Sequence, residues 1–273
     1  MSRIAGLLIG PVLAAFVALG GAQPAAAAEG GQREPHAPSE GWSFDGFFGH
    51  FDRAELQRGF QIYKEVCSSC HAMKFVAIRT LSQPGGPGFS EPAVKSVASE
   101  FKVPAGPDEK DGSLVDDVGL LRQRPAVPSD HFVGPYANEY AARAANGGAL
   151  PPDLSVIVKA RHDGASYVYS LLQCYEEPPP EVQLQPGMHY NPCMAGGQIA
   201  MPAPLVADRV TYDDGTAATV EQMSKDVAAF LAWAAEPELE GRRKLGFMVL
   251  FYLGVLAILS YLAYRRVWRD TGH

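Results

Sequence analysis

Apolar side chains recur at helical spacing in several parts of this sequence. In residues 52–66, Leu56 and Phe60 fall on one face of a helix, and Asp52 is placed to cap its first turn. A second amphipathic pattern covers residues 219–235 and leads almost directly into a long apolar stretch. These two patterns predict two long helices, one near the beginning and one near the end of the domain's sequence.

Weaker helical patterns cover residues 136–146 and 154–174. Residues 83–130 are rich in proline, glycine and charge and have little periodicity, so we expect a long insertion made mostly of loops. Another loop region begins at the three prolines 178–180 and continues past Pro204. The predicted fold is therefore mainly α, with long loop insertions.

Two apolar segments lie outside this domain and raise the apolar fraction of the 273-residue chain to 47%. The first, residues 1–28, has one basic residue, a short apolar run and four terminal alanines. This is the pattern of a secretory signal peptide, with cleavage expected before Glu29. The alternative is an N-terminal anchor that is retained.

The second apolar segment, residues 245–263, contains no charge and is long enough to cross a bilayer as a helix. Basic residues flank it on both sides, at 242–244 and at 265, 266 and 269. We predict a transmembrane anchor over residues 242–264; a buried core helix is the alternative. Because the signal directs export, residues 29–241 form an exported domain and residues 265–273 a cytoplasmic tail.

The exported domain is strongly acidic. Residues 29–240 contain 29 acidic and 16 basic side chains, a net charge of about −13. A field of this sign attracts basic partners and excludes nucleic acid as a ligand. Acidic clusters occur at residues 108–111, 116–117, 176–177 and 213–214. Solubility alone is the alternative explanation for this charge.

The pentapeptide Cys67-Ser68-Ser69-Cys70-His71 matches the C-x-x-C-H motif that attaches c-type haem. Each thiol adds to one vinyl group of the porphyrin, and the adjacent histidine supplies one axial ligand to iron. A thioredoxin-like redox pair would need a βαβ context, and a zinc site a second Cys/His pair; the sequence predicts neither. One motif predicts one covalently bound haem c.

The second axial ligand must come from elsewhere in the chain. Met201 is a strong candidate because Pro202 and Pro204 stiffen the backbone after its sulfur. The local sequence leaves other candidates open: Met188, Met194, His131, His162 and His189.

Cys174 and Cys193 remain once the haem motif has taken its pair. In an oxidising compartment two such cysteines tend to form a disulfide. The bridge would restrain the segment before Met201; two separate buried thiols are the alternative.

Several motifs together resemble the cytochrome c1 family of the cytochrome bc1 complex. They are residues 58–63 leading into CSSCH, residues 145–155 (ANGGALPPDLS), residues 199–202 (IAMP), and the single C-terminal anchor. The resemblance extends from about Trp42 to the end of the chain.

The resemblance implies a class I cytochrome c core and a set of site residues. It implies that Met201 is the axial methionine, that Arg161 pairs with a haem propionate and that Tyr167 lies near the same propionates. It also implies that Pro151 packs on the haem. The bacterial type of signal peptide favours a periplasmic location on the cytoplasmic membrane of a bacterium.

The implied function is electron transfer from a Rieske iron–sulfur protein to a c-type cytochrome, beside a cytochrome b subunit and within a dimeric complex. The chain would perform no independent catalysis and would serve an oxidoreductase complex. Ligation by His71 and Met201 fills both axial positions and argues against oxygen activation. The alternatives are a haem subunit of a terminal oxidase and an enzyme with an open haem site.

Overall fold

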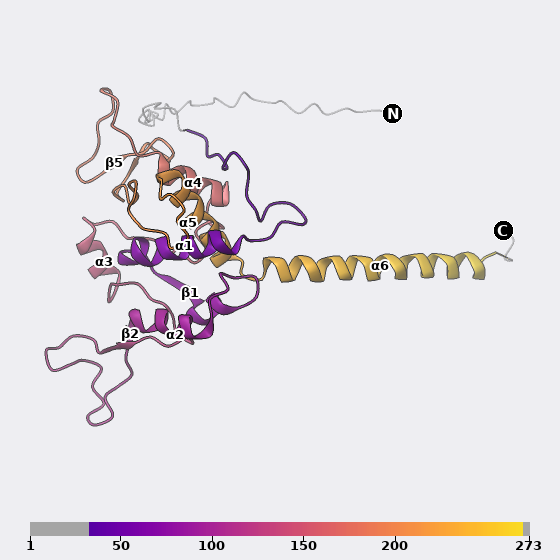
Figure 1. Cartoon of the computed structure of the whole chain (residues 1–273), viewed down its shortest axis with the longest axis horizontal. Helices are drawn as coiled ribbons and strands as arrows, with labels where there is room; N and C mark the ends of the chain where they lie inside the picture. Colours follow the sequence, from indigo (N-terminus) through magenta and orange to yellow (C-terminus); the bar gives the residue numbers. More distant parts are fainter. Residues whose placement is uncertain (1–32, 270–273) are drawn as a thin grey trace, which may run out of the picture.

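The computed structural model describes residues 33–269, so the predicted signal peptide lies outside the described residues. Within this range the chain forms six α-helices and three small antiparallel sheets, and α1, α4 and α5 lie in the middle of the domain (Figure 1). The helices are α1 (Arg53–Glu65), α2 (Glu91–Glu100), α3 (Glu139–Ala145), α4 (Gly164–Gln173), α5 (Val220–Ala235) and α6 (Leu239–Val267). Two 3-10 turns are η1 (Cys67–Ser69) and η2 (Ile78–Ser82).

Three two-stranded sheets complete the described fold. Their strands are β1 (Met73–Ala77), β2 (Lys102–Pro104), β3 (Gln123–Pro125), β4 (His131–Phe132), β5 (His189–Tyr190) and β6 (Gln198–Ile199). The pairs are β1 with β4, β2 with β3, and β5 with β6, all antiparallel. These short ribbons fasten loops onto the helices, and the predicted mainly helical class is confirmed.

The core forms where α1 crosses α5. Both helices begin as the sequence predicts, with Asp52 and Thr219 accepting hydrogen bonds from backbone N–H groups of the first turns. At the crossing, a Cβ on Gly59 would lie 2.1 Å from the carbonyl oxygen of Asp226 and 2.6 Å from Cβ of Phe230. Only glycine permits this close approach, which brings the aromatic rings of the two helices together in one buried cluster.

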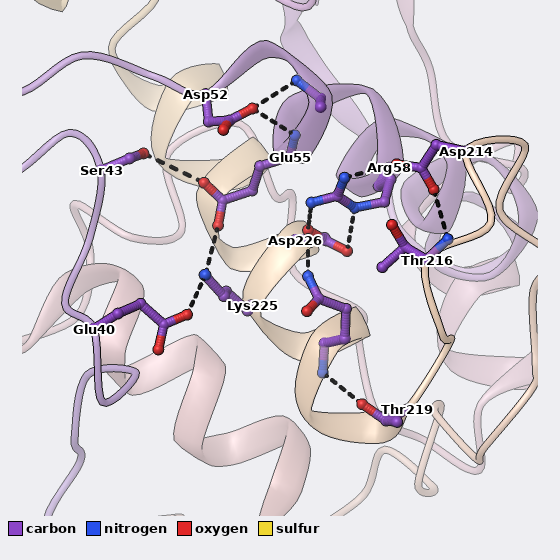
Figure 2. A network of polar contacts seen from close by, with 12 residues as sticks. Glu40, Ser43, Asp52, Glu55, Arg58, Asp214, Thr216, Thr219, Lys225 and Asp226 are labelled. Carbon is purple, nitrogen blue, oxygen red and sulfur yellow. Dashed lines mark hydrogen bonds and ion pairs between the residues drawn. The ribbon is translucent and has the colours of Figure 1, made fainter.

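A polar network closes one side of the same crossing (Figure 2). Arg58 on α1 pairs with Asp226 of α5 and with the more exposed Asp214. Further along, Glu55 of α1 lies 3.9 Å from the ammonium of Lys225, which also pairs with Glu40. The two helices are thus joined by charge as well as by apolar packing.

The predicted helix over residues 154–174 is wrong in its first half. Residues 155–160 form consecutive turns, and the helix α4 starts only at Gly164, whose φ of +53° interrupts the backbone. The side chain of Ser155 instead accepts a hydrogen bond from the N–H of Phe75. This tertiary hydrogen bond fixes the start of the stretch against β1, and local turns continue it to residue 160.

The prediction of mostly loops over residues 83–130 is confirmed, and the regular elements within this range are α2 and the β2–β3 ribbon. Ser90 caps α2, a proline occupies its first turn, and Val94 and Ala98 are buried one turn apart. The short helix α3 covers only the middle of its predicted range. Asn138 caps it by accepting a hydrogen bond from the N–H of Ala141.

The C-terminal helix α6 leaves the domain as a single projection (Figure 1). It has 29 residues and is long and apolar enough to cross a membrane, and its apolar window is not buried by the rest of the described chain. Only residues 236–238 separate it from α5. In this link, Glu236 pairs with both Lys159 and Arg242.

Candidate haem-binding site

The Cys67–His71 motif lies at the end of α1 that is farthest from α6 (Figure 1). The carbonyl of Cys67 accepts hydrogen bonds from the N–H groups of Cys70 at 3.1 Å and His71 at 2.9 Å. The hydroxyl of Ser68 donates to the carbonyl of Lys64 at 2.7 Å. These bonds fold the motif into a tight turn, with both thiols half-buried and outside any disulfide.

The ring of His71 is oriented by a backbone carbonyl. Its Nδ1 lies 2.8 Å from the carbonyl oxygen of Pro152, so Nδ1 carries the proton and donates. This leaves the lone pair of Nε2 for a metal, as is usual for histidine ligands with a carbonyl partner. Burial lowers the pKa of His71, and the neutral ring is the form that binds iron.

Residues 151–155 are fastened beside the motif by three hydrogen bonds. The N–H of Leu154 donates to the carbonyl of Ala72 at 2.8 Å, and the N–H of Lys74 donates to the carboxylate of Asp153 at 3.0 Å. The third is the bond to Ser155 described above. Pro151 is half-buried next to the proline that holds His71, so the structure brings Pro151 and His71 into one group.

A second group contains Arg161 and Tyr167. The guanidinium carbon of Arg161 lies 5.9 Å from the centre of the Tyr167 ring, a cation–π contact. The hydroxyl of Tyr167 donates to the sulfur of Met194 at 3.3 Å. The sulfur of Met194, one of the candidate ligands, therefore already has a polar partner in this structure.

The Met201 segment is held in place by three features. It follows β6, which pairs with β5; its backbone carbonyl accepts a hydrogen bond from the hydroxyl of Tyr175 at 3.0 Å. A disulfide joins Cys174, at the end of α4, to Cys193, with 5.9 Å between their Cα atoms. Within residues 33–269 no hydrogen bond joins the Met201 side chain to His71.

The residues of the motif fit a haem. The pair of thiols and a neutral histidine with a free Nε2 is the donor set that c-type attachment requires. The hydroxyl of Tyr63 is buried without a hydrogen-bond partner. Its pKa is raised by burial and by the nearby Cys67 and Asp153. A polar atom without a partner beside Cys67 indicates that the site is completed by a further group.

Three contributors were missed by the sequence analysis. They are Pro152, which orients His71, Tyr175, which holds the Met201 backbone, and Tyr63. Pro152 belongs to the PPDLS segment and Tyr175 follows a disulfide cysteine, so the sequence placed both next to recognised features. Their partners lie 81 and 26 residues away in the chain, and no local pattern reveals such pairings.

Comparison with known proteins assigns the chain to a family. The model of the Cytochrome C1 family matches residues 42–271. The chain belongs to the cytochrome c1 family. This membership confirms the class I cytochrome c core with long loop insertions and a C-terminal transmembrane helix. Cytochrome c1 proteins are the haem-bearing electron-transfer subunits of the bc1 complex.

Three relatives illustrate the range of this cytochrome c1 family. Cytochrome c1 of Rhodospirillum rubrum is 45% identical, over 94% of this chain and 94% of that protein. The mitochondrial cytochrome c1 heme protein of Saccharomyces cerevisiae is 48% identical, over 85% of this chain and 72% of its own length. A protein named Cytochrome b/c1 in Bradyrhizobium diazoefficiens is 44% identical over 98% of this chain, which spans only 40% of that protein.

Proposed function

We propose that this chain carries one haem c, bound through thioethers to Cys67 and Cys70, with His71 and Met201 as the axial ligands of iron. The observation that carries the proposal is the C-x-x-C-H turn at the end of α1, with His71 Nδ1 donating to the carbonyl of Pro152. When bound, a six-coordinate haem of this kind gains and loses single electrons without binding a substrate.

The residues around the motif would orient the haem and set its electrostatics. Arg161 and Tyr167, which contact each other, would lie at the propionates, where a guanidinium offsets negative charge. Pro151 would pack on the macrocycle beside the carbonyl that holds His71. The disulfide and Tyr175 would keep the Met201 loop at a fixed distance from iron.

The proposed direction of electron flow is from a Rieske iron–sulfur subunit to a c-type cytochrome, with a cytochrome b subunit alongside and the whole complex dimeric. One relative is named Cytochrome b/c1, which supports close association with a cytochrome b. The net charge of about −13 in residues 29–240 supports a basic acceptor.

The proposed topology follows the order of the segments. Residues 1–28 are a cleaved signal, residues 29–241 lie in the periplasm, residues 242–264 cross the cytoplasmic membrane and residues 265–273 stay inside. The apolar helix α6 supports the membrane crossing, and the signal pattern in residues 1–28 supports the orientation.

Affinity purification of the tagged full chain from its own membranes tests the proposal. We expect co-purification of a cytochrome b and a Rieske protein, together with a haem that remains on the chain after denaturation. The reduced spectrum should not change on addition of carbon monoxide, because both axial positions are filled. Co-purification with terminal-oxidase subunits, or a carbon monoxide adduct of the native haem, would contradict it.

A further inference from the structure

The segment before α1, residues 44–51, is a loop with two aromatic faces, called here the aromatic loop. Phe44 and Phe51 face the domain, with ring centroids 5.0 Å apart, and Phe51 is buried. Phe47 and Phe48 face outward and are 56% and 86% exposed. Two adjacent exposed phenylalanines are costly in water unless another phase or molecule covers them.

The aromatic loop is fastened to the first turns of α6. The guanidinium of Arg243 donates to the carbonyls of Phe44 and Gly49, each at 2.8 Å. The N–H of Phe51 donates to the carboxylate of Glu240 at 2.8 Å. Contacts at both ends of the loop therefore fix its position along the helix axis.

These contacts also fix the depth of the outward rings. The ring of Phe47 packs edge-on against Phe247 of α6, with centroids 6.3 Å apart. Phe247 lies two residues into the uncharged stretch that begins at Leu245, about 3 Å along the helix axis. The basic residues 242–244 lie on the other side, at the level where lipid headgroups would surround α6.

We propose that Phe47 and Phe48 insert into the interfacial layer of the lipid bilayer, as a second membrane contact beside α6. Aromatic side chains are enriched at this depth of a membrane. The continuity of Phe47 with the transmembrane helix favours lipid over a soluble protein as the occupant. With two contacts on the bilayer, the domain cannot pivot freely about the base of α6. The proposal concerns the membrane alone and does not depend on the haem ligands.

A depth measurement on the haem-loaded full chain in vesicles of phosphatidylcholine and phosphatidylglycerol tests the proposal. Phe48→Cys is labelled with an environment-sensitive fluorophore, and the control is Tyr140→Cys. Tyr140 is 85% exposed and lies on α3, at the far end of the domain from α6 (Figure 1). The chain without an added cysteine controls for background labelling. Quenching by nitroxide-labelled lipid is compared with quenching by aqueous iodide.

We expect several-fold stronger quenching by the lipid nitroxide at position 48 than at position 140, and the reverse order for iodide. Equal accessibility to iodide at the two positions would overturn the proposal. It would also be overturned if position 48 were open to iodide in vesicles and became shielded only in the assembled complex. That result would assign the aromatic loop to a protein partner.

Discussion

The guanidinium of Arg58 holds the carboxylate of Asp226 through two hydrogen bonds, from Nε and Nη2, each 3.0 Å long. The pair joins α1 to α5 (Figure 2), and Asp226 is completely buried. Burial raises the pKa of Asp226, and Arg58 opposes this rise by stabilising the charged form. The helix that ends in the haem motif is therefore attached to the helix that leads to the membrane by a desolvated ion pair.

Replacing Arg58 by leucine should destabilise the domain strongly. It leaves Asp226 buried without its cation, and breaking such a pair costs about 3–5 kcal/mol. Asp214→Asn removes only the exposed partner of Arg58 and should have a much smaller effect. Unfolding of the detergent-solubilised chain by guanidinium chloride measures the free energy of unfolding of both variants. Equal stability of Arg58→Leu and the unmodified protein would show that the pair contributes nothing.

Glu55 should make stability depend on pH. Burial raises its pKa from the ordinary 4.5 to about 7; Lys225 opposes the rise, and Asp226 and Asp52 add to it. Below the unfolded pKa the group is protonated in both states. Between about pH 4.5 and about pH 7 the unfolded chain has lost this proton while the buried carboxyl of the folded protein keeps it. The stability therefore falls across this range, by up to about 3 kcal/mol in total, and the contribution of Glu55 is constant above it.

The variant Glu55→Gln should remove this dependence. Its unfolding free energy should exceed that of the unmodified protein by a margin that grows between about pH 4.5 and about pH 7 and is constant above that. Glu65→Gln, at an exposed position of the same helix, is the matched control. A constant difference across this range would mean that Glu55 does not titrate as described.

Met201→Leu should lower the reduction potential of the haem while the chain still folds. Leucine roughly conserves volume but supplies no sulfur, and the loss of a thioether favours the oxidised iron. A shift on the order of 100 mV or more is expected, since axial ligands tune haem potentials over a wide range. Met194→Leu is the control, because Tyr167 already binds that sulfur. A potential changed only by Met194→Leu would assign the ligand to Met194 instead.

Loss of the disulfide should loosen the segment that carries Met201. In the chain-entropy model, closing a loop of this length stabilises the fold by about 3 kcal/mol. The double variant Cys174→Ala/Cys193→Ala should therefore unfold at a lower temperature. Non-reducing peptide mapping should find the two cysteines linked in the native protein. Complete alkylation of both thiols without a reductant would exclude the bridge.

Reduction of a basic c-type cytochrome should slow markedly as salt rises, because steering over distances beyond about 8 Å is screened at physiological ionic strength. The structure already pairs some of the acidic groups internally: Asp108 with Arg122, Asp214 with Arg58 and Glu176 with Arg33. Charge-neutralised variants of residues 116–117 and 176–177 can be compared for their effect on the second-order rate. A rate independent of salt in every variant would leave solubility as the role of these charges.

The sequence predicted correctly the helices that have both an N-terminal capping residue and regular apolar spacing. Asp52 and Thr219 cap α1 and α5, and regular apolar spacing follows each cap, so local physics and the tertiary fold agree. It failed between residues 154 and 163. Apolar spacing continues there, but the N–H of Leu154 bonds to the carbonyl of Ala72, the side chain of Ser155 bonds to β1, and Gly164 takes a positive φ. Long-range polar pairing there outweighs helix propensity.

Long-range pairing also limits how much of the site can be predicted from the sequence. The Cys67–His71 motif and the PPDLS segment can each be recognised as a short sequence motif. Their contact through the carbonyl of Pro152 joins positions 81 residues apart and depends on the whole core. The aromatic loop is similar, since only the fold brings Phe47 against Phe247.

The close crossing at Gly59 has a consequence for how the protein meets its redox partners. The helices α1, α5 and α6 form one connected frame. The close crossing joins α1 to α5, and the ion pairs of Glu236 lie at the junction between α5 and α6. We expect this frame to hold the Cys67–His71 motif at one height and azimuth above the bilayer. A partner moving near the membrane then has fewer orientations to sample before a productive encounter, which reduces the rotational entropy lost on docking.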